Sequence, residues 1–321
     1  MSEEIRRSSG IGGTDISAIL GLNKWSSPYD VWTKKKGYGF PVQENDPMMW
    51  GTLLEPVVAD FYSRKTGVEL RSVERQRHPD HPWYLGTPDR LSAQHETPMV
   101  LEVKTAGVHV MSNWGPAESG PAGVPDQYNL QLRWYLGLPM FEGEHASYGD
   151  IAVLLAGQDF RIYRLWRDTR IEDMLKEQAE KFWNAYIIGD GQPPYDGSDA
   201  ATRFLHDKFK DSTQEMVKDD TPIVEWVHRL KEAREKIAQA KQDEEIAKQY
   251  VKDYIGNKRG VTGEWGRIVW SRMPGKKTIS WKRMVMKLIE DGIIPQSLLE
   301  DFTSKGNDYS AFRPTFNKES V

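Results

Sequence analysis

Apolar side chains recur with helical spacing in several parts of the chain. The clearest set follows i, i+3, i+4, i+7, i+8 and i+11: Trp50, Leu53, Leu54, Val57, Val58 and Phe61. This spacing predicts an amphipathic helix with a buried apolar stripe, ending at Thr66-Gly67. Pro56 fits such a helix only in its first turn or at a kink.

Capping residues and periodic apolar positions predict further helices, beginning near Thr14, Ser27-Pro28, Pro125-Asp126, Asp168 and Ile223. The first follows a glycine-rich stretch, 10–13, with Thr14 as its N-cap. The second ends in Lys34–Lys36, because cations suit a helix C-terminus. The last, 223–255, is charged, and its near-heptad pattern slips after Ala240. A helical hairpin or a surface helix is therefore favoured over a long coiled coil.

Strands are predicted where apolar residues alternate or run together between turn signals. Two apolar runs, 148–155 and 160–166, are joined by a short turn and predict a hairpin. Segments 84–91 and 99–105 flank a polar, turn-rich connection and predict a second hairpin. A further strand is expected at 261–270. Helices and strands together predict an α/β protein.

Stretches rich in glycine, proline and polar residues mark the connections. Residues 108–125 are expected to form a loop. Gly189–Pro194 indicates a boundary between two domains, 1–194 and 195–321. Residues 195–222 are polar and are expected to be partly mobile. The second domain is predicted to contain the long charged helix and a small basic β/α segment.

Composition narrows the classes of function. The chain has 321 residues and no cysteine, which excludes disulfides, thiolate metal sites and cysteine nucleophiles. It lacks an apolar run long enough for a membrane span and a secretory signal, so a cytoplasmic location is expected. The net charge of −4 does not itself indicate a nucleic-acid binder. A DNA enzyme of this balance must concentrate its positive charge in a groove.

Candidate chemistry centres on Asp89, Glu102 and Lys104. Side chains alternate along a strand, so Glu102 and Lys104 share one face, and the predicted hairpin brings Asp89 beside Glu102. Two carboxylates supply the oxygen ligands that Mg²⁺ prefers. A bound metal lowers the pKa of a water molecule, and Lys104 could orient that water or stabilise charge at phosphorus. An exposed ion pair on a strand is the alternative interpretation of Glu102 and Lys104.

An ordered series of motifs carries a family resemblance. Its members, in chain order, are Arg7, Ile11-Gly12-Gly13-Thr14-Asp15, Trp50-Gly51-Thr52-Leu53-Leu54-Glu55, Thr87-Pro88-Asp89, Leu101-Glu102-Val103-Lys104 and Tyr128-Asn129-Leu130-Gln131. Over residues 5–190 the chain resembles the YqaJ-like viral recombinase family, which includes the phage lambda-type exonucleases. The resemblance implies a PD-(D/E)xK nuclease core: a mixed central sheet flanked by helices, followed here by a helical and small β extension.

The resemblance also implies roles for individual residues. Asp89 and Glu102 resemble metal ligands, joined by the backbone carbonyl of Val103, with Glu55 completing the shell through water. Lys104 resembles the catalytic lysine. The position of scissile phosphate or attacking water would be set by residues on one helix face, Gln131 and Tyr128. A pocket for a 5′-phosphate is implied, made by Arg7, Thr14 and Thr87. Independently, backbone N–H groups at a glycine-rich helix start attract anions, and arginine adds a bidentate charge.

The implied activity is Mg²⁺-dependent degradation of linear duplex DNA from a 5′ end, leaving a 3′ single strand for annealing recombination; Mn²⁺ is expected to substitute. A trimeric ring, a single-strand annealing protein as partner and a phage or prophage origin in a bacterial cytoplasm are expected with it. Two alternatives stay open: a structure-specific or nicking endonuclease, and a docking module in which the nuclease is secondary. Weaker likeness to phage C-terminal extensions rests on 279–282 and 312–314.

Overall fold

The computed structural model describes residues 6–39, 45–94, 98–211, 216–217, 222–271, 275 and 278–303. The chain divides into two compact units, residues 1–210 and 211–321. The first unit extends past the expected boundary at 194, because a helix over 199–208 packs into its core. The motif Phe312-Arg313-Pro314 lies outside the described residues.

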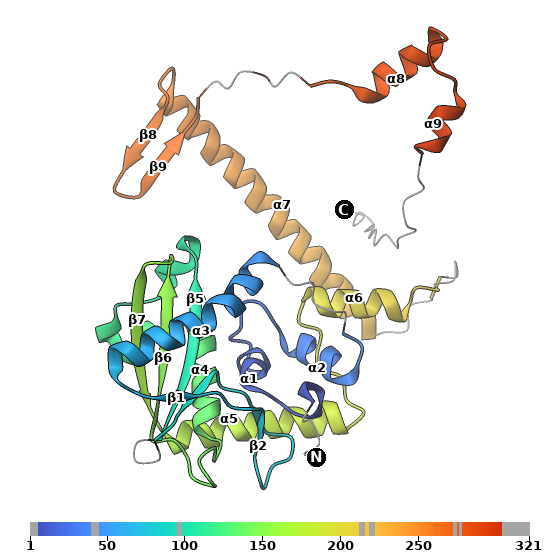
Figure 1. The fold of residues 1–321 in the computed structure, drawn as a ribbon. Helices are drawn as coiled ribbons and strands as arrows, with labels where there is room; N and C mark the ends of the chain where they lie inside the picture. Colours follow the sequence, from blue (N-terminus) through green and yellow to red (C-terminus); the bar gives the residue numbers. More distant parts are fainter. Residues whose placement is uncertain are drawn as a thin grey trace. The chain divides into compact units, whose positions relative to one another are not determined.

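A five-stranded mixed sheet forms the centre of the first unit (Figure 1). Its strands, in spatial order, are β1 (Leu70–Arg71), β4 (Arg90–Ser92), β5 (Met99–Ala106), β6 (Tyr148–Leu155) and β7 (Asp159–Trp166). Only the β5–β6 pair in this sheet is parallel. The β6–β7 hairpin confirms the expectation for 148–166. A separate two-stranded pair joins β2 (Gln76–Arg77) to β3 (Leu85–Gly86).

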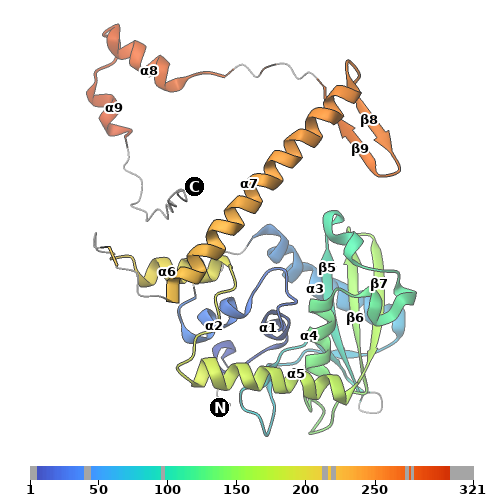
Figure 2. The ribbon, with the colours of Figure 1, turned by 180° about the vertical axis from the view of Figure 1, so that it is seen from behind.

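Helices cover both faces of the sheet, as Figures 1 and 2 show from opposite sides. One face packs against α3 (Asp46–Thr66), through a cluster that includes Val58, Tyr62, Leu101 and Val103. The opposite face, with Val100, belongs to the larger core formed with the remaining helices of this unit. These are α1 (Gly13–Ile19), α2 (Pro28–Lys36), α4 (Asp126–Leu136), α5 (Thr169–Phe182) and α6 (Asp199–Lys208). The expected mixed sheet flanked by helices is confirmed.

Helix α3 ends at Gly67 as expected, but most of the expected buried stripe is exposed. Trp50, Leu53, Val57 and Phe61 are exposed, whereas Val58 of that stripe is buried together with Ala59 and Tyr62. Helical periodicity places apolar residues on one side of a helix without saying whether another element covers that side. Here the sheet contacts Val58 at the margin of the stripe and the residues beside it.

The segment 84–91 is not one continuous strand. It is split into β3 and β4 by Thr87-Pro88-Asp89, and the two strands belong to different sheets. Proline cannot donate to a strand ladder, which fits a break at this position. The pairing of β4 with β5 nevertheless keeps Asp89 next to the strand that carries Glu102, as the hairpin prediction required.

Two connecting segments contain more structure than expected. Residues 195–222 include α6, whose Ala200 and Ala201 are buried. The 108–125 loop contains two 3-10 helices, η2 (Val108–Asn113) and η3 (Ala117–Gly123); a third, η1 (Arg7–Ser9), precedes α1. Helix α5 continues into a π-helical turn, η4 (Trp183–Ile188). The polar composition of 195–222 concealed the few small residues that α6 buries.

The second unit contains α7 (Pro222–Ile255), a hairpin of β8 (Gly260–Gly263) and β9 (Gly266–Val269), and two short helices, α8 (Trp281–Glu290) and α9 (Ser297–Asp301). Helix α7 is continuous, so the helical hairpin alternative is wrong. The single strand expected over 261–270 is also wrong: it folds back on itself around Gly263–Gly266.

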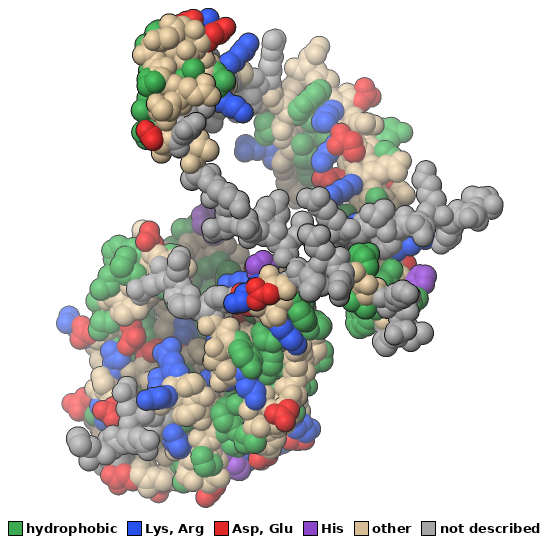
Figure 3. Space-filling model, turned by 90° about the vertical axis from the view of Figure 1, so that its right-hand side faces the viewer, with side chains coloured by type: hydrophobic (Ala, Val, Ile, Leu, Met, Phe, Trp, Pro, Cys, Tyr) green, Lys and Arg blue, Asp and Glu red, His purple; other side chains and the backbone are tan. Residues whose placement is uncertain are grey.

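Surface charge is mixed. On the face shown in Figure 3, Lys and Arg side chains are interspersed with Asp and Glu side chains. Among the residues that the structure describes, no helix has the length and apolar character needed to cross a membrane. A concentrated positive region must therefore be sought in a cleft, as the net charge of −4 led us to expect.

Candidate active site

Strand pairing brings Asp89 to the strand that carries Glu102 and Lys104. Arg90 pairs with Leu101, so Asp89 falls opposite the next residues of β5. The backbone N–H of Val103 donates to Asp89 Oδ2 at 2.7 Å. The alternation along β5 directs Leu101 and Val103 toward α3, whereas Glu102 and Lys104 point toward α4. The expected juxtaposition of the three polar residues is thereby confirmed in geometry.

Glu102 is the most enclosed member of this group. Its side chain is 2% exposed, and its Oε1 accepts hydrogen bonds from Lys104 Nζ and Gln131 Nε2, both at 2.5 Å. Its other oxygen, Oε2, is buried and has no hydrogen-bond partner among the described residues. A buried carboxylate oxygen without a partner is costly, so this position favours a cation.

Burial raises the pKa of Glu102 to about 8 from an ordinary value of 4.5; Lys104 opposes this shift and Asp89 adds to it. Burial likewise raises the pKa of Asp89, although Lys104 and the Val103 N–H act against it. Burial alone would lower the pKa of Lys104, but the two acids outweigh it and the net shift is upward. In the metal-free protein a charged Lys104 therefore lies beside a Glu102 that keeps its proton up to a pKa of about 8.

The donor set fits a hard divalent cation. Asp89 and Glu102 offer carboxylate oxygens, one of them without a protein partner, which is the chemistry that Mg²⁺ and Mn²⁺ bind. Within the described part of the chain, no group of three or more His, Cys, Asp or Glu side chains could hold a metal. The protein would therefore supply few direct ligands and leave other positions to water and substrate. The carbonyl of Val103 as a ligand stays a prediction.

Glu55 does not join the two acids in one cluster. It lies on α3, at the other face of the sheet, and its Oε1 forms an ion pair with Arg90 Nη1 at 2.7 Å. Its charge still contributes to raising the pKa values of Asp89 and Glu102. A contact to a metal through water stays a prediction for this residue.

Helix α4 supplies the wall opposite β5. Gln131 is buried and lies within 3.1 Å of the Tyr135 hydroxyl as well as bonding to Glu102. Tyr128, one turn earlier, presents its ring to Lys104, whose Nζ is 5.1 Å from the ring centroid. Trp114, which is buried, stacks on the same ring with centroids 5.4 Å apart.

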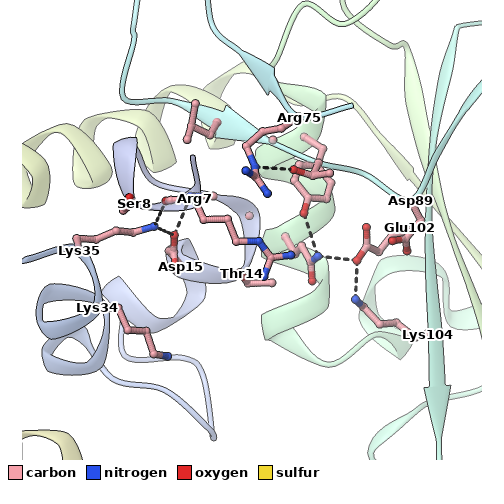
Figure 4. A pocket seen from close by; sticks show the side chains of 17 residues that line it. Arg7, Ser8, Thr14, Asp15, Lys34, Lys35, Arg75, Asp89, Glu102 and Lys104 are labelled. Atoms are coloured by element: carbon pink, nitrogen blue, oxygen red, sulfur yellow. Dashed lines mark hydrogen bonds and ion pairs between the residues drawn. The ribbon is translucent and has the colours of Figure 1, made fainter. Parts of the chain in front are cut away.

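A cleft of about 690 Å³ opens beside these groups. Its lining joins Asp89, Glu102, Lys104 and Gln131 to residues from three further helices, η1, α1 and α2, and from two loops: Arg7, Thr14, Lys34, Lys35, Arg75 and Thr87. In the close view of Figure 4, Arg7 extends past Thr14 toward the side where Glu102 and Lys104 lie. The cleft therefore has an acidic floor and a cationic end, and the three residues of the predicted phosphate pocket are all at its surface.

Thr14 is not the N-cap of α1, contrary to the sequence prediction. The N-cap is Gly12, whose backbone N–H donates to the side chain of Asp15 at 2.9 Å. A carboxylate at the third helical position can cap in this way, so threonine is not needed for the task. Thr14 lies in the first turn instead, exposed at the cleft.

The sequence analysis did not identify two of the cleft residues. Lys35, expected only at the end of a helix, has a side chain that is 7% exposed, and its Nζ contacts Asp15 Oδ2 and the carbonyl of Arg7, each at 2.8 Å. It holds η1, which carries Arg7, against α1. Arg75 donates from Nε to the Thr87 hydroxyl at 3.2 Å. The capping carboxylate at Asp15 could have indicated a partner for a lysine, whereas Arg75 stands in a segment with no periodic signal.

Several known proteins resemble this chain in sequence or in structure. A profile of the YqaJ-like viral recombinase domain matches residues 4–139. The uncharacterized protein YqaJ of Bacillus subtilis (strain 168) is 31% identical over 285 residues, covering 85% of each chain. Among solved structures, the alkaline exonuclease LHK-Exo of Laribacter hongkongensis has a TM-score of 0.43 and 16% identity, covering 64% of this chain and 95% of that one. A phage-related exonuclease of Haemophilus somnus 129PT has a TM-score of 0.42 and 11% identity, covering 64% and 96%.

Proposed function

This chain belongs to the YqaJ-like viral recombinase family, and from that premise we propose that it is a metal-dependent deoxyribonuclease. In its specific form, the proposal is a 5′→3′ exonuclease that digests linear duplex DNA and leaves a 3′ single strand for annealing recombination. Mg²⁺ is the proposed cofactor, with Mn²⁺ as a substitute.

One observation carries the proposal. The buried Oε2 of Glu102, unpartnered within the described residues, lies beside Asp89 and Lys104 at the floor of a cleft whose other end is cationic. Glu172, which pairs with Arg167, also has a buried oxygen without a partner among the described residues, but it lies outside this cleft. At Glu102 the unpartnered oxygen has a second carboxylate, Asp89, beside it in a cleft that an anionic polymer can enter.

A divalent ion held by Asp89 and Glu102 would supply a water of lowered pKa and a charge against the phosphate oxygens. The chain's own residues perform the remaining tasks. Lys104, held by Glu102 and facing the ring of Tyr128, presents an ammonium group to the reacting phosphate. Gln131 fixes the orientation of the Glu102 carboxylate from α4. Preorganised charges of this kind lower the barrier without reorganising during the reaction.

The cationic end supports recognition of a DNA terminus. Arg7, Thr14 and Thr87 line it together, and Arg75 orients the Thr87 hydroxyl. Guanidinium and hydroxyl groups are good donors to a terminal phosphate, which has more charge than an internal phosphodiester. We propose that this end binds the 5′-phosphate while Asp89, Glu102 and Lys104 act on the first bond inward.

The remaining parts of the proposal concern assembly and setting. A ring of three subunits, a single-strand annealing protein as partner, and action in a bacterial cytoplasm on behalf of a phage or prophage stay predictions. The chain would need a substrate with free ends, and the annealing partner would take up the 3′ strand that digestion exposes.

An end-dependence assay tests the activity. The full chain is incubated with Mg²⁺ and one plasmid in two forms, covalently closed and linearised. An exonuclease degrades the linear form and leaves the closed circle intact, whereas a nicking or structure-specific endonuclease converts the circle as well. With EDTA both forms should survive. Loss of the linear form in EDTA, or survival of both forms in Mg²⁺, would exclude the proposed nuclease.

A further inference from the structure

The hairpin of the second unit has an aromatic surface that the cleft does not use. Trp265 is 64% exposed and Trp270 is 47% exposed. Exposed tryptophans occur elsewhere too, at Trp25, Trp166 and Trp226 among others, so what distinguishes this hairpin is that two of them lie on one short element. Tyr250 and Tyr254, on the last turns of α7, are exposed beside the start of the same segment. The apolar rings thus gather at one end of the second unit.

The strand register places the two tryptophans on one face of the hairpin. Val261 pairs with Ile268, and the Trp270 N–H donates to the Arg259 carbonyl at 2.9 Å, so Trp270 and Ile268 point the same way. Trp265 joins them across the turn, since a Cβ placed on Gly263 would come within 2.5 Å of its indole nitrogen. Gly263 therefore leaves room for the indole to lie across the strand.

The same segment is basic: Arg259 lies opposite Trp270 and shares its face, whereas Arg267 alternates with Ile268 and points to the opposite face. Residues 256–271 contain Lys258, Arg259 and Arg267 against a single acid, Glu264. Within the described residues, none of the three cations forms an ion pair, whereas Lys248 and Lys252 on α7 are paired with Glu244 and Glu245. A hollow of about 520 Å³ joins Lys258 and Arg259 to Trp270 at the base of the hairpin. Cations and an exposed ring therefore line the same depression.

The hairpin is held in place by the helix before it. Two isolated strands are marginal in water, but Ile255, the last residue of α7, is buried, and the Lys258 N–H donates to its carbonyl at 3.1 Å. The end of α7 therefore fixes the position of the hairpin's aromatic rings and cations within the second unit.

We propose that this hairpin binds single-stranded DNA, with bases stacked on Trp265 and Trp270 and phosphates held by Lys258 and Arg259. Duplex DNA hides its base faces, so exposed rings beside cations suit an unpaired strand. An apolar protein partner would not require unpaired cations beside the rings. The inference rests on the proposed function in one respect: the bound strand would be the 3′ strand that digestion releases.

Binding is tested with the full chain in EDTA, where no cleavage occurs, so failure here leaves the nuclease assay unaffected. Affinity for fluorescent oligo(dT) of about 16 nucleotides is measured by anisotropy. Trp265→Ala and Trp270→Ala should each weaken binding about tenfold. Trp226→Ala is the matched control, because Trp226 is 60% exposed on α7 and has its ring covered by Arg229. Its affinity should equal that of the parent.

Two further measurements separate stacking from charge and from misfolding. Replacing Lys258 and Arg259 by alanine should reduce the slope of log K against log salt by about 1.4, whereas the tryptophan variants should keep the parent slope. Trp265→Phe with Trp270→Phe retains aromatic faces and should recover most of the affinity. Unchanged oligo(dT) affinity in the alanine variants overturns the proposal, as does an equal loss for a blunt duplex. A change in self-association alone would identify a protein interface and also overturn it.

Discussion

The side-chain amide of Gln131 donates to Oε1 of Glu102 across 2.5 Å, joining α4 to β5 at the floor of the cleft. The same oxygen accepts a hydrogen bond from Lys104 Nζ, so the carboxylate is held from two sides. Its second oxygen, Oε2, is left for a cation. The geometry of this acid therefore depends on a helix far from it in sequence.

Replacing Gln131 with leucine should release Glu102 from that orientation. Groups that orient metal ligands are commonly worth about 10–100-fold in activity or metal affinity, so we expect Gln131→Leu to lower the rate of linear-duplex digestion by that factor. Gln127→Leu, on the same helix but outside the cleft lining, is the control and should digest normally. Equal rates for both variants would deny Gln131 its positioning role.

Lys104→Ala should abolish most cleavage while sparing DNA binding. The ammonium group acts on the reacting phosphate in the proposed mechanism, so its removal should cost about 10²–10⁴-fold in the single-turnover rate. Affinity for duplex DNA in Ca²⁺ or EDTA should stay close to that of the parent. Lys181→Ala, which removes an exposed lysine on α5, serves as the control. A fully active Lys104→Ala protein would contradict the assignment.

The raised pKa of Glu102 predicts that the free energy of unfolding of the metal-free protein depends on pH. Its folded pKa of about 8 lies above the ordinary 4.5, so the folded state retains a proton that the unfolded state loses. The penalty is absent below 4.5, grows between the two values and is complete above about 8. Glu102→Gln should therefore raise the free energy of unfolding at about pH 8 and leave it unchanged at about pH 4. Urea titrations at both pH values measure this difference.

The same residue couples metal binding to protons. A cation at Glu102 must displace the retained proton, so the increase in Tm caused by Mg²⁺ should be larger at about pH 8 than at about pH 6. Glu102→Gln should show little increase at either pH. A parent protein whose Tm responds to Mg²⁺ identically at both pH values would argue against Glu102 as a ligand.

Arg7→Ala should remove a preference for phosphorylated ends. If the cationic end of the cleft binds a 5′-phosphate, the parent digests 5′-phosphorylated duplex faster than the 5′-hydroxyl form, and Arg7→Ala should bring the two rates together. Digestion of the hydroxyl form should change little, because Arg7 has no proposed role at the scissile bond. Arg6→Ala, at the adjacent exposed position, is the control. Equal rates on both ends for the parent would remove this pocket.

The helix that carries Glu55 is anchored by a buried acid. Asp150, fully buried on β6, accepts from Tyr62 of α3 at 2.7 Å and from Arg164 at 2.8 and 2.9 Å. Asp150→Asn turns an amide toward these donors and should lower the free energy of unfolding by about 2 kcal/mol. Asp60→Asn, which breaks an exposed pair with Arg64, should cost about 0.5 kcal/mol or less. Urea unfolding distinguishes the two variants.

Local sequence rules predicted the centre of the site because they depend on short-range geometry. Strand alternation places Glu102 and Lys104 together whatever surrounds them, and the polar connection after Ser92 returns the chain beside Asp89. The position of Gln131 on α4 came from the family resemblance, and the structure adds its direct bond to Glu102.

Errors arose where a neighbour decides the outcome. The stripe of α3 has the period of a buried face, but the sheet covers Val58 at its margin together with Ala59 and Tyr62, which lie outside it. Thr14 is a good cap by type, yet Asp15 occupies the donor of Gly12. Arg75 lies at the cleft and donates a hydrogen bond to Thr87, a contact that the periodicity of the sequence does not predict. Such pairings join segments distant in sequence, so single-residue preference cannot identify them.

The one parallel pairing in the sheet has a consequence for how the site assembles. Asp89 meets Val103 through a short antiparallel return, whereas β5 meets β6 only after the chain has passed through α4 and returned to Tyr148. A long excursion must close before that pairing forms, and its loop entropy slows the step. On a ribosome, the acids would thus emerge and adjoin well before the helix that orients them. Competence for chemistry would come late in maturation, after the nascent polypeptide has extended beyond β6.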